Sequence, residues 1–119
     1  MFHSCGNVFK LIPNLINIGM DIFDPVQRIK NGKDISELKK DYGNKITFHG
    51  NISTQTTLTF GTIEDVGKEV IDLIKVFGQE GGLILCTDQL IQHDVPIKNI
   101  QALYGTAYEY GNLERVKTI

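Results

Sequence analysis

The chain has 119 residues, enough for one modest domain and too few for two. Hydrophobic residues make up 41% and charged residues 22%, which excludes a disordered or fibrous class. A formal net charge of −2 gives no attraction to nucleic acid or to an anionic membrane surface. The apolar runs are too short for a membrane span and no secretory leader is visible, so we expect a cytoplasmic protein whose two cysteines are free thiols.

The N-terminal residues predict a strand followed by a helix. Residues 1–5 form a short apolar strand, and residues 7–19 carry apolar side chains at helical spacing. Pro13 lies inside that pattern, so the helix is expected to begin or kink near it. Gly19 is expected to end the helix as a left-handed cap.

A second strand and helix follow. Residues 20–26 read as a strand that Pro25 ends. Asp34 is the candidate N-cap of a helix over 34–43, with Glu37 at the capping-box position.

The third unit contains the most regular helix of the chain. A strand is predicted from Ile46 to Phe48, and a helix over 62–78 begins with Thr62 and Asp65 as a capping pair. The charged side chains of this helix, Glu69 among them, are expected to form a solvated face. Its apolar stripe comprises Val66, Val70, Leu73, Ile74 and Phe77.

The fourth unit ends the domain. The unbroken apolar run at 82–86 predicts a strand buried on both faces, and Pro96 begins a helix over 96–111. Residues 112–119 read as a polar tail outside a domain spanning 1–111. The side chains expected to point inward from the last helix are Ile97, Ile100, Leu103 and Tyr104.

This β-α alternation predicts an α/β fold with parallel strands joined by right-handed crossovers. A small open sheet and part of a (β/α)₈ barrel are both compatible with four such units. The segments FHSCGNVFKLIPNLINIGMDIFDPVQ, ITFHGNIST, FGTIEDVGKEVIDLI and HDVPIKNIQAL, in this order, resemble the C-terminal part of the uroporphyrinogen decarboxylase superfamily. The resemblance covers about residues 1–111 and implies four βα repeats forming the C-terminal half of a (β/α)₈ TIM barrel, with the N-terminal half-barrel absent.

The superfamily contains two chemistries, and the resemblance implies one of them for the completed barrel. One branch decarboxylates uroporphyrinogen, a tetrapyrrole, without a cofactor. The other comprises cobalamin-dependent methyltransferases, which use zinc to activate a methyl acceptor such as a thiol. His3 and Cys5 match the His-x-Cys zinc pair of the second branch, so zinc and a methylcobamide carried by a corrinoid protein are the implied cofactors. The decarboxylase, and a non-catalytic half-barrel subunit or remnant, remain the alternatives.

The sequence leaves the identity of the third zinc ligand undecided. Cys86 is one candidate, although a small buried thiol explains it equally well. Alignment of Pro96 with the family pattern places Gln89 where the family's zinc cysteine stands, and Asp88 is a further possibility.

Other polar residues near strand ends are candidates for catalysis or substrate binding. Asp24 could orient a zinc-bound histidine, receive a proton, or merely cap a turn. The side chains of His49, Asn51 and Gln89 are the candidate substrate contacts.

Overall fold

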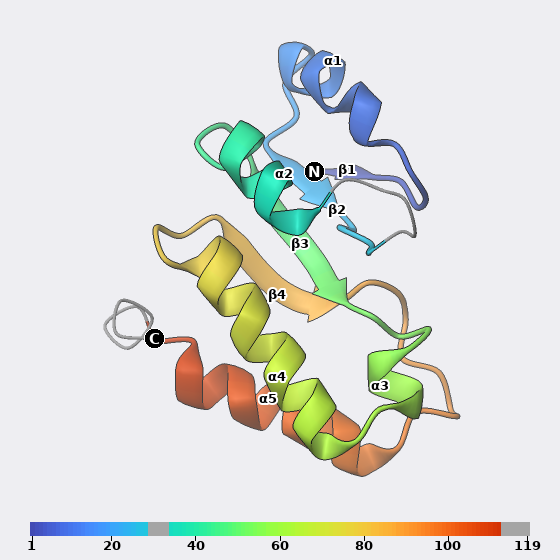
Figure 1. Cartoon of the computed structure of the whole chain (residues 1–119). Coiled ribbons are helices and arrows are strands. Elements are labelled where there is room, and N and C mark those ends of the chain that lie inside the picture. The colour runs from blue at the N-terminus through green and yellow to red at the C-terminus, as the bar shows by residue number, and fades with distance from the viewer. Residues whose placement is uncertain (29–33, 113–119) are drawn as a thin grey trace.

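The computed structural model describes residues 1–28 and 34–112, so nearly all of the predicted polar tail lies outside the described residues. Its centre is a sheet of four strands in the order β1-β2-β3-β4, with every neighbouring pair parallel. The chain is therefore an α/β protein with four parallel strands, as the alternation predicts (Figure 1). The strands are β1 (Phe2–His3), β2 (Ile22–Asp24), β3 (Thr47–Ile52) and β4 (Leu83–Thr87).

Short-range signals in the sequence place the first two helices. A 3-10 turn, η1 (Phe9–Leu11), leads into α1 (Ile12–Asn17), which begins around Pro13 as predicted. Gly19 follows with φ 97°, the left-handed conformation predicted for the cap. Helix α2 (Ile35–Tyr42) is capped by Asp34, whose Oδ1 accepts a hydrogen bond of 2.8 Å from the Ser36 amide.

The later helices include one that the sequence pattern missed. Helix α3 (Thr57–Phe60) is a single turn between β3 and α4. Helix α4 (Ile63–Leu73) starts with the predicted capping box of Thr62 and Asp65 and continues as a π-helical segment, η2 (Ile74–Gly78). Helix α5 (Ile97–Tyr110) follows Pro96.

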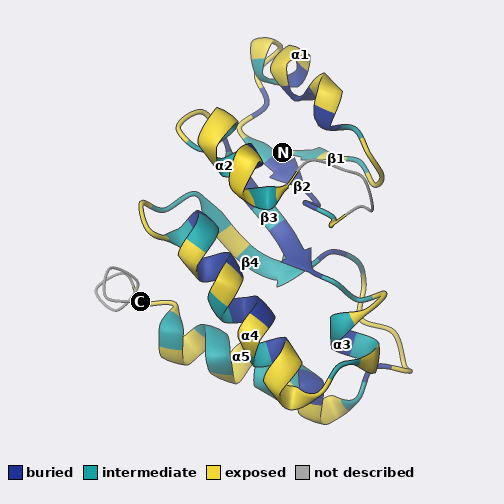
Figure 2. Cartoon of the chain, in the orientation of Figure 1, coloured by how far each residue is buried: buried dark blue, intermediate teal, exposed yellow. Residues whose placement is uncertain are grey.

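The core lies between the sheet and the helices that follow its strands. The rings of Phe48 on β3 and Phe77 on η2 pack with centroids 4.8 Å apart. Figure 2 shows the buried residues gathered along the sheet and the inner side of α4. All of the predicted stripe is buried: Val66, Val70, Leu73, Ile74 and Phe77.

Three expectations are wrong, one about the length of a strand and two about burial. The third strand continues past Phe48 to Ile52, so His49 and Asn51 lie within it. Strand β4 is not buried on both faces, since the side chain of Ile84 on one face is 42% exposed. On α5 only part of the predicted inward set is covered, since Ile97 is 73% and Tyr104 is 55% exposed.

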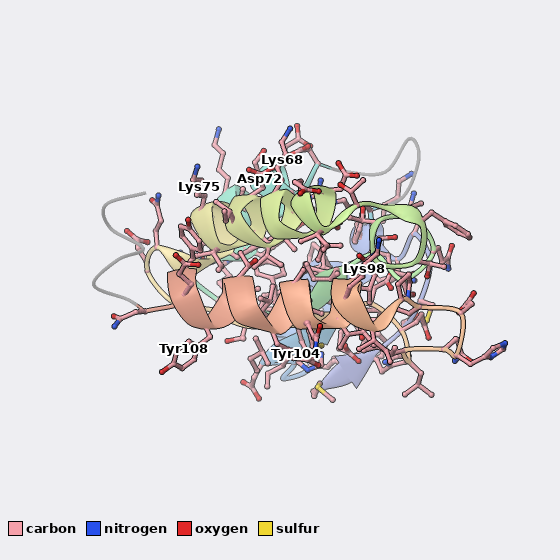
Figure 3. The ribbon with its side chains drawn as sticks, turned by 90° about the horizontal axis from the view of Figure 1, so that it is seen from below. Lys68, Asp72, Lys75, Lys98, Tyr104 and Tyr108 are labelled. Atoms are coloured by element: carbon pink, nitrogen blue, oxygen red, sulfur yellow. The ribbon has the colours of Figure 1, made fainter. Side chains whose placement is uncertain are left out.

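Helix α5 has a second, outward apolar face. Tyr104 and Tyr108 extend from α5 on the side away from α4, whereas Lys68, Asp72 and Lys75 lie on the far side of α4 (Figure 3). Helical periodicity identifies which residues share a face, but not whether another element covers that face. No helix among residues 1–28 and 34–112 is both long and apolar enough to cross a membrane.

Candidate functional site

Polar side chains from neighbouring strands meet near the carboxyl ends of the sheet. His3 ends β1 and Asp24 ends β2, and the two residues are register partners. Asn51 on β3 is the register partner of Cys86 on β4. Because all four strands are parallel, their carboxyl ends lie at the same end of the sheet, where loops can bring side chains together.

Asp24 joins two histidines through its two carboxylate oxygens. Its Oδ2 lies 2.5 Å from Nδ1 of His3, and its Oδ1 lies 2.5 Å from Nδ1 of His49. An ionised carboxylate only accepts, so each ring donates its Nδ1–H and each neutral ring keeps a free lone pair on Nε2. Asp24 thus orients His3, one of the roles considered from the sequence, and orients His49 as well.

The environment of Asp24 favours its charged form. The residue is only 8% exposed, and burial alone raises the pKa of its carboxyl. The hydrogen bonds from His3 and His49, together with the positive charge those rings can carry, outweigh burial and lower the pKa below its ordinary value of 3.8. The carboxylate therefore remains an acceptor for both rings at neutral pH.

Cys5 faces the free nitrogen of His3. Its Sγ lies 3.7 Å from His3 Nε2, as expected for two residues that project from the same side of an extended segment. A zinc ion about 2.0 Å from nitrogen and about 2.3 Å from sulfur, with tetrahedral angles, would span two such atoms about 3.5 Å apart. The His3–Cys5 pair therefore fits two positions of a tetrahedral zinc site.

Cys86 contacts the other histidine, His49. Its Sγ lies 3.5 Å from Nε2 and 3.6 Å from Nδ1 of His49, and it also contacts the Thr87 carbonyl at 3.3 Å. Burial raises the pKa of the Cys86 thiol, and the nearby carboxylates of Asp24 and Asp88 raise it further. The structure thus pairs Cys86 with His49, and pairs Cys5 with His3.

The side chain of Gln89 reaches Cys5 from the loop after β4. Its Nε2 lies 2.8 Å from Cys5 Sγ. The Asp88 carboxylate is hydrogen-bonded elsewhere, because its Oδ1 accepts from the Thr54 amide at 2.9 Å and from the Thr54 hydroxyl at 2.7 Å. Asp88 is a buried anchor for the loop, and Gln89 is the residue that the loop presents to Cys5.

Asn51 is a buried polar group with unused hydrogen-bonding capacity. It has φ 97° and is 2% exposed, and neither Oδ1 nor Nδ2 has a hydrogen-bond partner among the described residues. An unpaired buried amide is costly, so a bound molecule is one way to satisfy it. Its candidacy as a substrate contact stays a prediction.

Glu69 departs from the predicted solvated face. It is 8% exposed, its Oε1 accepts from the Ser53 amide at 3.3 Å, and the same oxygen lies 3.8 Å from Arg28 Nε. Its place between Val66 and Val70 in the apolar stripe is the sequence signal that could have revealed this burial.

Glu69 lines a cavity of about 840 Å³, and Gln89 lines another of about 610 Å³.

In the described part of the chain, no three His, Cys, Asp or Glu side chains are grouped so that they could hold one metal ion. The pair His3 and Cys5 provides two suitable ligands, and its third polar neighbour is an amide. The full predicted set of His3, Cys5 and Cys86 is therefore not assembled around a common point.

Comparison with known proteins gives one family and two relatives. The family model described as uroporphyrinogen decarboxylase (URO-D) matches residues 1–110. The methylcobamide:CoM methyltransferase MtaA of Methanosarcina barkeri is 31% identical over 111 residues, which are 92% of this chain and 30% of that protein. A solved methyltransferase from Methanosarcina mazei has a similar fold, with a TM-score of 0.69 and 23% identity, over 91% of this chain and 30% of the other. The chain thus spans less than a third of the length of either relative.

Proposed function

Because the chain belongs to the uroporphyrinogen decarboxylase family, we propose that it is the zinc-holding part of a methyltransferase that moves a methyl group from a cobamide to a thiol. The observation that carries the proposal is the His3–Cys5 pair at 3.7 Å, with His3 oriented by Asp24. The similarity to a methylcobamide:CoM methyltransferase supports the same chemistry. The corrinoid would arrive on a partner protein, and the acceptor would be a small thiol.

Zinc, when bound, lowers the pKa of a coordinated thiol so that the nucleophilic thiolate forms at neutral pH. The chain's own residues prepare the place for this. Cys5 and the Nε2 atom of His3 are the ligands that fit, and the Asp24 carboxylate holds the His3 ring in the tautomer that leaves Nε2 free. The same carboxylate holds His49, whose ring would face the acceptor together with Asn51.

We propose further that the four βα units form the C-terminal half of a (β/α)₈ barrel. Two observations support it: the strands follow chain order in one parallel sheet, and β1 and β4 stand at its outer edges. Four further units would pair with these edges and cover the exposed face of α5, which carries Ile97, Tyr104 and Tyr108. Catalysis would then need the remainder of the barrel.

The cytoplasm remains the proposed compartment, since the described cysteines are free thiols.

Elemental analysis of the purified chain tests the metal on which the proposal depends. We expect about one equivalent of zinc in the unmodified chain, loss of zinc in Cys5→Ser, and no loss in Ser4→Ala, a neighbouring control. Circular dichroism would establish that all three chains are folded. Absence of zinc from the folded, unmodified chain would contradict the proposal, and binding of a porphyrinogen by that metal-free chain would favour the decarboxylase instead.

A further inference from the structure

The sheet ends on each side in a strand that has one neighbour. Among the described residues, β1 pairs with β2 alone and β4 pairs with β3 alone. All four strands run in the same direction, so the free side of β4 can accept a further strand that runs as β1 does. The unpaired amide and carbonyl groups of such an edge are a template for pairing with another chain.

One face of the sheet is also left uncovered. Leu83 and Leu85 on β4 pack against the core beneath the helices, whereas Ile84 between them lies on the opposite face and is 42% exposed. The register partner of Ile84 on β3 is His49, so the candidate site lies on this same face. In a closed eight-stranded barrel this face is the interior, where side chains from all strands pack together.

Helix α5 carries an apolar face toward the place of the next βα unit. Ile97, Tyr104 and Tyr108 are spaced by seven and four residues and share this face, and both tyrosines extend away from α4 (Figure 3). In a (β/α)₈ barrel the helices form an outer ring in chain order, so α5 lies beside the helix that follows the strand paired with β4. If that strand is β1 of a second copy, the neighbouring helix is α1. Helix α1 and the residues at its two ends offer a matching pair of exposed apolar side chains, Leu11 and Ile18.

We infer that two copies of this chain close one barrel, with β4 of each copy paired to β1 of the other. The inference rests on the proposed half-barrel. A two-fold axis along the barrel preserves the direction of every strand, so all eight strands are parallel and no edge is left unpaired. The carboxyl ends of all strands then lie at one mouth of the barrel, which holds two equivalent clusters of His3, Asp24 and His49.

The exposed tyrosines supply a large share of the area that such a dimer needs. Tyr104 is 55% and Tyr108 is 92% exposed. Since burial of an aromatic side chain removes about 150–250 Å² from water, the two rings offer about 220–370 Å² in each copy and twice that in the pair. A standard interface buries about 1,200–2,000 Å² in total, and the exposed aliphatic side chains and the strand edges add to the tyrosine area.

Sedimentation of the purified chain, from micromolar to millimolar concentration, counts the copies. We expect twice the chain mass of 13.3 kDa, with no further increase at high concentration, because a closed pair has no free edge. Tyr108→Glu places a charge in the interface without touching the core, and should raise the dissociation constant of the dimer by more than about tenfold. Lys75→Glu is the control, because Lys75 lies on the far side of α4 and the substitution changes the charge by two units rather than one (Figure 3). This variant should remain a dimer.

Hydrogen exchange tests the pairing of the strands. The amides of β4 should exchange more slowly in the unmodified dimer than in Tyr108→Glu, and equal exchange would overturn the proposed arrangement. A folded chain that stays monomeric, or a mass that keeps growing with concentration, would overturn the inference.

Zinc analysis of the same samples separates this inference from the proposed chemistry. A monomer that holds zinc would overturn the inference and leave the zinc proposal intact. A dimer without zinc would support the inference and contradict the zinc proposal.

Discussion

Replacing Asp24 with asparagine tests the arrangement on which the site depends. The carboxylate accepts from Nδ1 of both His3 and His49, each at 2.5 Å. An asparagine has a single accepting oxygen, and its amide nitrogen only donates. One ring can keep its Nδ1–H bond, whereas the other must turn its Nδ1 into an acceptor and carry its proton on Nε2.

The ring that changes is expected to be His3. Its side chain is 59% exposed and free to adapt, whereas that of His49 is 26% exposed and held against Cys86. A proton on Nε2 removes the lone pair that would bind zinc. Loss of such a carboxylate partner costs about 10–100-fold in metal affinity. The corresponding free energy is about 1.4–2.7 kcal/mol.

Nitrogen-15 chemical shifts of the imidazole rings report which nitrogen carries the proton. The unmodified chain should show Nδ1–H in both rings, and Asp24→Asn should show Nε2–H in His3. Zinc titrations of the same samples supply the affinity. Asp21→Asn is the matched control, since it removes an equal charge from an exposed position three residues earlier. If both rings of Asp24→Asn kept Nδ1–H and zinc affinity equalled that of Asp21→Asn, the reasoning would be refuted.

Three further predictions concern stability and are measured by urea unfolding. Phe77→Ala should cost about 3–5 kcal/mol, because the fully buried ring packs on Phe48, whereas exposed Tyr108→Ala should change stability by less than about 0.5 kcal/mol; equal effects would contradict the described core. Thr62→Ala should cost about 0.5–2 kcal/mol, since it removes the cap of α4, and an unchanged midpoint would argue against the capping box. Since the pKa of Asp24 is lowered from 3.8, its stabilising contribution is complete above pH 3.8 and lost as the pH falls through the lower, folded-state value. The stability difference between the unmodified chain and Asp24→Asn should therefore shrink below pH 3.8, and a constant difference would contradict this.

Local features of the fold were predictable because they depend on adjacent residues. The cap of α2 needs only Asp34 and the amide of Ser36, and the start of α4 needs only Thr62 and Asp65. The exposure of Ile97 was not predictable in the same way. Its periodicity places it on an apolar face of α5, but only the spatial neighbours of that helix decide whether the face is covered.

The site shows the same division between near and distant information. His3 and Cys5 were predicted to act together because alternation in an extended segment brings residues two apart to one side. That His49 would share the carboxylate of Asp24 depends on how β2 and β3 pair, and the predicted third strand ended before His49. The predicted strand ended one residue before His49, and the contact between His49 and Asp24 was therefore not predicted.

The positions of the Cys86 and Gln89 side chains depend on contacts between segments that lie still further apart in the sequence. Cys86 is held in β4 opposite Asn51, so the register of the sheet places its sulfur beside His49. Gln89 follows the end of that strand, and the buried carboxylate of Asp88 anchors the loop. The Gln89 amide contacts Cys5, which follows β1, the outer strand on the other side of the sheet. The register of the sheet and the anchoring of the loop therefore decide which side chain lies beside Cys5, and neither can be inferred from the chemical type of the residues.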